Sequence, residues 1–258
     1  MDGARRHAGS RGVSVARTEH IEAPKWNARA PRSRADLFGM RAGPLVALLA
    51  GVVLAVTGAA QLYAGLLQAR AMNALELIDW DDHPPTASAL TPIIDDLGRA
   101  DDWWPEPVDA LTLGELQMRL AVLDGGTPAA ASLKRAVLEL KQSVSQGPAS
   151  ATAWAWLAYA YLLTGDKSAA VSDALSNSIK LARFEPVLLA MRCEIGLAIY
   201  GSLKPDRRAE LADQIRLLAR RSPRELVRVT KDTGKLAIVI QALLGGDNET
   251  LQRFQDAL

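Results

Sequence analysis

An uncharged segment near the N terminus constrains this fold more than any other feature of the sequence. Residues 42–69 contain no Asp, Glu, Lys or Arg, and most of them are Ala, Leu, Val or Gly. As an α-helix at about 1.5 Å per residue, the segment would reach about 40 Å, which exceeds the roughly 30 Å hydrocarbon core of a bilayer. Residues 42–69 are therefore predicted to form a single transmembrane helix.

The charges on either side of this segment predict its orientation. Residues 1–41 carry nine Lys or Arg side chains and four acidic ones, whereas residues 71–258 carry 20 basic and 25 acidic side chains. Lys and Arg close to a span are preferentially kept in the cytoplasm. We therefore expect the N terminus to be cytoplasmic and the larger C-terminal part to be exported.

Two alternatives concern the N-terminal region. Ala69-Arg70-Ala71 has the A-x-A pattern of a signal-peptide cleavage site, although the apolar run is about twice the usual core of roughly 7–15 residues. Met40, followed by Arg41 and then at once by the apolar run, would also suit as the start of translation. Residues 1–41, rich in Arg, Ala, Gly, Pro and Ser, are expected to be a cytoplasmic disordered tail, because this composition cannot build a core; with a start at Met40, residues 1–39 would instead be an extension that is not translated.

Glycines recur every seven residues within the predicted span, at Gly51, Gly58 and Gly65. Small residues on one helix face allow a second helix to approach closely, so this face is a candidate for homo-oligomer formation through the transmembrane helix. Glycine is also common in membrane helices generally, which is the simpler explanation.

The rest of the sequence predicts an all-α fold. Residues 70–107 form a membrane-proximal segment with a short helix at 87–100, and residues 108–258 show apolar spacing of three and four throughout. No run of alternating β-branched residues predicts a strand. We expect about nine helices after the span, mostly antiparallel neighbours because the connections are short.

Residues 151–182 resemble a tetratricopeptide repeat, a hairpin of two helices. The matching positions are Trp154, Leu157, Ala158, Tyr161, Gly165 and Ala170. The small side chains of Ala158 and Ala170 would let the two helices touch. Pro186, which would close the repeat, comes about one turn late, so the second helix is expected to be extended. A weaker copy of the hairpin is expected in residues 109–146.

A wider region, residues 145–240, resembles a family of small bacterial accessory proteins for exopolysaccharide synthesis, the VpsP-like group. The similarity lies in residues 148–154, 184–187 and 208–235. It implies a non-catalytic scaffold of polysaccharide assembly or export, anchored in the bacterial inner membrane with residues 108–258 in the periplasm. The expected partners are other proteins of envelope polysaccharide assembly, and nucleic acid is not expected.

No residue pattern predicts catalysis, a cofactor or a metal site. Only one histidine, His83, follows the span, and the sequence contains no G-x-S-x-G, phosphate-loop or G-x-G-x-x-G motif. Three acidic doublets are candidates for a carboxylate pair or a divalent-ion site: Asp81/Asp82, Asp95/Asp96 and Asp101/Asp102. Adjacent side chains point apart, however, and such doublets usually occupy turns and helix ends. The single cysteine, Cys193, is expected to be a buried, unreactive thiol.

The first candidate partner site is a group of tryptophans, Trp80, Trp103 and Trp104, among acidic residues. Indole rings stack on sugars while carboxylates accept hydrogen bonds from hydroxyl groups. The alternative function is therefore a periplasmic saccharide-binding protein. Packing within the first helical hairpin is the plainer explanation of the same residues.

The second candidate is a basic cluster, in which Arg216, Arg220 and Arg224 follow one another at four-residue spacing. Such a cluster would bind an anionic polymer, a lipid headgroup or an acidic partner protein. It would equally serve as a solvated helix face.

Overall fold

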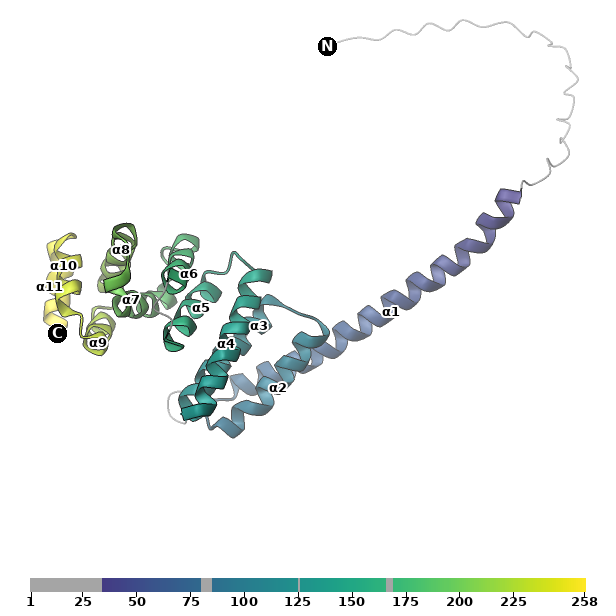
Figure 1. Cartoon of the computed structure of the whole chain (residues 1–258), viewed down its shortest axis with the longest axis horizontal. Helices are drawn as coiled ribbons and strands as arrows, with labels where there is room; N and C mark the ends of the chain where they lie inside the picture. Colours follow the sequence, from purple (N-terminus) through teal and green to yellow (C-terminus); the bar gives the residue numbers. More distant parts are fainter. Residues whose placement is uncertain (1–33, 80–84, 125, 166–168) are drawn as a thin grey trace, which may run out of the picture. The chain divides into compact units, whose positions relative to one another are not determined.

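The computed structural model describes residues 34–79, 85–124, 126–165 and 169–258 (Figure 1). Contacts divide the chain into two compact units, residues 1–53 and residues 54–258, which are treated separately. The described part of the first unit is the beginning of helix α1. The first residues of the predicted disordered tail, up to residue 33, lie outside the described residues, whereas α1 already begins at Arg34.

The described residues form eleven α-helices and two 3-10 turns, without a strand, so the predicted all-α class is confirmed. Ten α-helices follow α1, one more than expected. In chain order the elements are α1 Arg34–Glu76, α2 Ala87–Trp103, α3 Pro107–Asp124, α4 Gly126–Gln146, α5 Ala151–Leu163, α6 Ala169–Leu181, η1 Pro186–Leu188, α7 Leu189–Ala198, η2 Tyr200–Ser202, α8 Pro205–Arg221, α9 Pro223–Thr233, α10 Leu236–Leu244 and α11 Asn248–Ala257.

The helices pack as sequential hairpins (Figure 1), and two of these have a glycine where the helices approach each other closely. A Cβ atom on Gly114 of α3 would lie 2.5 Å from Cγ of Leu140 on α4, and one on Gly196 of α7 would lie 2.5 Å from Cδ1 of Leu211 on α8. Ala158 of α5 is fully buried in a cluster that also contains Val171 and Ala174 of α6. The close approach of α3 to α4 and of α7 to α8 therefore depends on a missing side chain.

These hairpins confirm the predicted helix pairs at residues 151–182 and 109–146, whereas the α7–α8 hairpin was not anticipated. The expected extension of the second helix before Pro186 is wrong. Helix α6 ends at Leu181 and has 13 residues, as does α5. Pro186 instead begins the turn η1. Its fixed φ angle suits the first position of a helical turn, where the missing N–H has no role.

The junction between α6, α7 and α8 is built around Arg192, whose side chain is fully buried. Its guanidinium donates to the carbonyl oxygens of Ser178 and Ala182 at the end of α6, each at 2.8 Å. It also donates to Ser178 Oγ at 3.0 Å and to Gln214 Oε1 of α8 at 3.3 Å. The carbonyls at a helix C terminus carry partial negative charge, so they are suitable partners for a buried cation.

Two neighbouring groups show the effect of this environment on ionisation. Desolvation lowers the pKa of Arg192 to about 10, which leaves the guanidinium protonated at neutral pH. Burial raises the pKa of the adjacent Cys193 thiol well above its ordinary value. The prediction of a buried thiol at Cys193 is confirmed.

Candidate functional site

The candidate site lies where α1 changes from an uncovered to a covered helix. Residues 43–76 are long and apolar enough to cross a membrane, and none of the most apolar window is buried. From Gly43 to Tyr63 no residue is buried, and the first buried residue is Ala64. By length and composition this helix is suited to be a membrane span or a signal segment.

Beyond this point α1 packs against α2. Ala64 and Leu67 of α1 form a small buried cluster with Ala100 of α2. One turn further on, Ala71 joins a second cluster with α2 and α3, whose other buried members are Leu90, Ile93, Ile94, Leu97, Leu113 and Leu116. The last part of α1 is therefore a structural member of the domain formed by residues 54–258.

The two helices run antiparallel, because partners on α2 move backwards along the chain as α1 advances. The ring of Tyr63 meets the ring of Trp103 edge to face, with centroids 5.6 Å apart and planes at 76°. Seven residues later, Arg70 Nε lies 3.2 Å from Asp96 Oδ2. Helix α2 thus ends at Trp103, beside the last uncovered residues of α1.

Trp103 and Trp104 keep much of their surface accessible in this arrangement, at 57% and 37% of their maximum. The third predicted member of the group, Trp80, lies outside the described residues. The structure therefore places one tryptophan of the group directly against the apolar helix. Sequence reasoning missed the contact with Tyr63, since the two rings are 40 positions apart.

One residue from each of two acidic doublets links structural elements near this site. Asp96 is nearly buried between Arg70 and Arg99, whose NH2 lies 2.6 Å from Asp96 Oδ1. Asp101 accepts a hydrogen bond from Gln142 Nε2 at 2.7 Å and one from the backbone N–H of Glu106 at 3.3 Å. The remaining doublet, Asp81/Asp82, lies outside the described residues.

A third carboxyl group, that of Asp109, also links α3 to α1. Its Oδ1 accepts a hydrogen bond from Gln68 Nε2 at 2.8 Å, and its residue is 3% exposed. Burial raises the pKa of Asp109 to about 6, against the lowering effect of the Gln68 hydrogen bond; the nearby Glu106 and Asp101 contribute in the same direction as burial.

The basic cluster is largely engaged in holding helices together. Arg216 of α8 pairs with Asp213 and donates to the Ala242 carbonyl of α10 at 3.0 Å. Arg220 NH2 lies 2.7 Å from Asp247 Oδ2, the residue that caps α11. Among the described residues, Arg224 is exposed and makes no ion pair. The structure thus does not present the three arginines as one free cationic surface.

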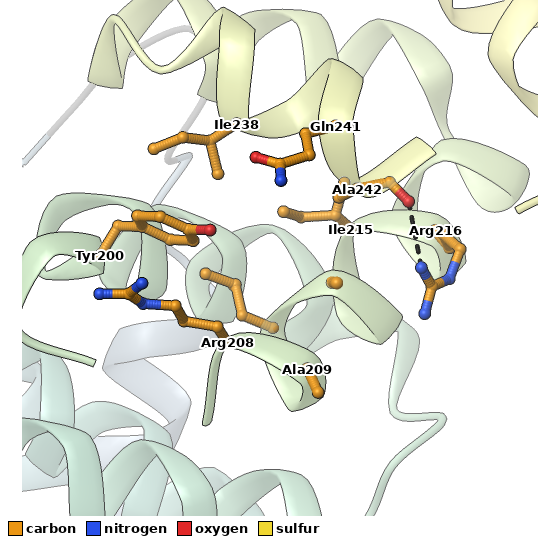
Figure 2. A pocket seen from close by; sticks show the side chains of 10 residues that line it. Tyr200, Arg208, Ala209, Ile215, Arg216, Ile238, Gln241 and Ala242 are labelled. Atoms are coloured by element: carbon orange, nitrogen blue, oxygen red, sulfur yellow. Dashed lines mark hydrogen bonds between the residues drawn. The ribbon is translucent and has the colours of Figure 1, made fainter. Parts of the chain in front are cut away.

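A small cavity lies beside this cluster between α8 and α10 (Figure 2). Its volume is about 240 Å³, below the roughly 300 Å³ at which small-molecule sites begin. The guanidinium of Arg208 lies 5.0 Å from the ring centroid of Tyr200, and Ile238 and Gln241 line the opposite wall. Its size and mixed lining are those of a packing gap, and we assign it no ligand.

The residues of the predicted repeat signature occupy structural positions. Leu157 and Ala158 are buried, Trp154 Nε1 donates to the Pro148 carbonyl at 2.9 Å, and Gly165 has the positive φ of 83° that ends α5. The list is completed by Tyr161, whose ring centroid lies 5.6 Å from Lys141 Nζ, and by Ala170, a half-buried residue of α6.

The glycines of the apolar helix stand in open surroundings. A Cβ added to Gly51, Gly58 or Gly65 would have no atom within 4 Å other than its own helix backbone and immediate neighbours. No contact within the described chain therefore explains their seven-residue spacing.

Comparison with known proteins gives no family assignment. The sequence matches no model of a protein family, and no curated protein is significantly similar to it.

Proposed function

We propose that this protein is a scaffold anchored in the bacterial inner membrane, with its N terminus in the cytoplasm and its helical hairpins in the periplasm. The observation that carries the proposal is the double character of α1. No residue of the helix is buried from Gly43 to Tyr63, where lipid would be its solvent, and the helix enters the core of the following domain from Ala64 onward.

The same observation supports retention of the anchor. Cleavage after Ala71 would remove Ala64, Leu67 and Ala71 from the two buried clusters that they share with α2 and α3. It would also remove Gln68, the hydrogen-bond donor to buried Asp109, and Arg70, a partner of Asp96. A signal peptide is discarded after export and has no reason to contribute to the core of the mature domain.

The scaffold role rests on the hairpin array. Tetratricopeptide-like hairpins stack side by side and present an extended, concave surface to a partner. The α3–α4 and α7–α8 hairpins each have a glycine at the close approach that such packing needs, and α5–α6 has the small, buried Ala158 in its core. The similarity to the VpsP-like group adds the context, in which the partners are proteins of exopolysaccharide assembly or export and the scaffold itself catalyses no reaction.

Anchoring is tested by expressing the full chain with a C-terminal epitope in a bacterial host. We expect an uncleaved polypeptide that resists alkaline extraction and whose C terminus is digested by protease in spheroplasts. A shortened chain in the soluble periplasmic fraction, or a C terminus protected by the inner membrane, would overturn the anchor or its orientation.

The scaffold role is tested by photocrosslinking in cells. Phe184 and Val187, at the junction of α6 and α7, are 67% and 82% exposed and are suitable positions for a photoreactive amino acid. We expect crosslinks to a protein of polysaccharide assembly and a loss of surface polysaccharide when the gene is deleted. Normal polysaccharide in the deletion strain would remove this function. Leu138 of α4, 64% exposed, serves as the matched position on another hairpin.

A further inference from the structure

We propose that Tyr63, Trp103 and Trp104, here termed the aromatic corner, lie in the headgroup layer of the periplasmic leaflet and form a second contact between protein and membrane. The inference rests on the proposed function, because it requires α1 to span the bilayer. It assigns the exposed tryptophans to lipid rather than to a saccharide or a protein partner.

The first argument is one of length. The charge-free run of α1 begins at Ala42, directly after Arg41, and at about 1.5 Å per residue the helix from there to Tyr63 extends about 30 Å, which is the thickness of the hydrocarbon core. Tyr63 therefore falls at the boundary between hydrocarbon and headgroups. Its edge-to-face contact with Trp103 places the end of α2 at the same depth.

The second argument is chemical. Tyr and Trp are enriched at both interfaces of membrane proteins, because their rings are apolar and each carries one polar atom that can remain hydrated. Trp103 exposes 57% of its surface and Trp104 exposes 37%, whereas tryptophan side chains are on average highly buried. A headgroup layer would cover the rings without removing their polar atoms from water.

Nearby charges limit the depth of insertion. Asp102 and Glu106 flank the two tryptophans, and carboxylates are costly in hydrocarbon, so the corner is held at the headgroup level. Arg70, the first charged residue after the apolar run, is seven positions beyond Tyr63, about 10 Å along the helix and at the outer edge of the headgroups.

The test uses the full-length protein reconstituted into phosphatidylcholine vesicles whose acyl chains carry bromine either close to the headgroup or near the bilayer centre. Bromine quenches tryptophan emission only at short range. We expect quenching by the shallow bromine, and we expect Trp103→Phe combined with Trp104→Phe to remove most of the emission that shallow bromine quenches. The matched pair Trp154→Phe with Trp156→Phe, in α5, should leave that quenching in place.

The inference would be overturned if bromine near the headgroup did not quench tryptophan emission, or if this quenching survived Trp103→Phe combined with Trp104→Phe. Quenching that appears only after phosphatidylglycerol is added would also overturn it. The same holds if lipid bromine has no effect while added polysaccharide changes the emission in a way that depends on Trp103 and Trp104. If the double variant loses its helical circular dichroism, the single variants Trp103→Tyr and Trp104→Tyr, which keep an aromatic ring at each position, are compared instead.

Failure of the anchor and failure of this inference give different results. A protein that leaves the vesicles on alkaline washing contradicts the transmembrane proposal. A protein that stays with the vesicles but shows no shallow quenching contradicts only the aromatic corner.

Discussion

Replacement of Arg192 by methionine tests whether a buried guanidinium stabilises the junction of α6, α7 and α8. Methionine has a similar length but no donor and no charge. The replacement removes four hydrogen bonds, two to carbonyls of α6, one to Ser178 Oγ and one to Gln214 of α8. The variant therefore isolates the polar contribution of this side chain from its packing volume.

The magnitude follows from two opposing effects. Hydrogen bonds from a charged group contribute about 1.5–3 kcal/mol each, which gives a gross loss of roughly 6–12 kcal/mol if they add. Burial, however, lowers the pKa of Arg192 to about 10, and removing the charge relieves a desolvation cost on the order of 3 kcal/mol. In the variant, the carbonyl oxygen of Ser178 still accepts a hydrogen bond from the backbone N–H of Ala182 at 3.3 Å, and that of Ala182 accepts one from Glu185 at 3.4 Å. These remaining bonds reduce the loss of stability further. We expect the variant to be less stable by about 3–5 kcal/mol.

The assay is urea unfolding of the full-length protein in detergent, followed by far-ultraviolet circular dichroism, with hydrogen exchange at the end of α6 as a local readout. Arg221→Met, at an exposed arginine that ends α8, is the matched control and should change stability by less than about 0.5 kcal/mol. An Arg192→Met protein as stable as the parent would refute the reasoning, because desolvation would then outweigh the hydrogen bonds.

Further predictions concern close contacts, ionisation and backbone geometry. Gly114→Ala should destabilise the α3–α4 hairpin by about 1–3 kcal/mol, since the new Cβ would lie 2.5 Å from Leu140, whereas Gly98→Ala, with open space around it, should be neutral or stabilising in thermal unfolding. Asp109→Asn should raise stability at pH 7 by up to about 3 kcal/mol. The pKa of Asp109 is raised from 3.8 to about 6 in the native state, so the native protein takes up a proton at a higher pH than the unfolded chain does. The free energy of unfolding of the parent therefore rises as the pH falls from about 7 to 4, and the variant lacks this rise. Equal pH profiles of parent and variant in urea unfolding would contradict this prediction. Gly165→Ala should cost about 1 kcal/mol in the same assay because φ is 83°, and an unchanged midpoint would argue against that strain.

Local patterns predicted the helices, whereas contacts between distant segments could not be predicted. The α5–α6 hairpin was predictable because Trp154, Leu157 and Ala158 follow helical spacing within a few residues. The α7–α8 hairpin has Gly196 at the equivalent crossing but no tryptophan one turn earlier; Arg192 stands there instead. The sequence around Arg192 does not predict that its guanidinium would donate hydrogen bonds to carbonyl oxygens at the end of α6.

The candidate sites show the same limit. Arg216 and Arg220 appear in the sequence as neighbouring cations, and only the fold brings Ala242 and Asp247 to them. Trp103 was predicted to belong to a partner site or to pack in the first helical hairpin, but its position beside Tyr63 depends on the antiparallel packing of α2 on α1. An unpaired charge or an exposed ring is therefore judged reliably only after the helices are placed.

The single residue between α8 and α9 has a consequence for how the last helices are arranged. Helix α8 ends at Arg221, and after Ser222 the next helix begins with Pro223. Proline lacks the amide hydrogen and clashes with the preceding turn, so a helix cannot continue through it without a kink. A helix that continued straight through Ser222 and Pro223 would turn Leu226 and Val229 away from the core cluster in which they are buried. The direction in which the chain leaves α8 is thus set by the two residues Ser222 and Pro223.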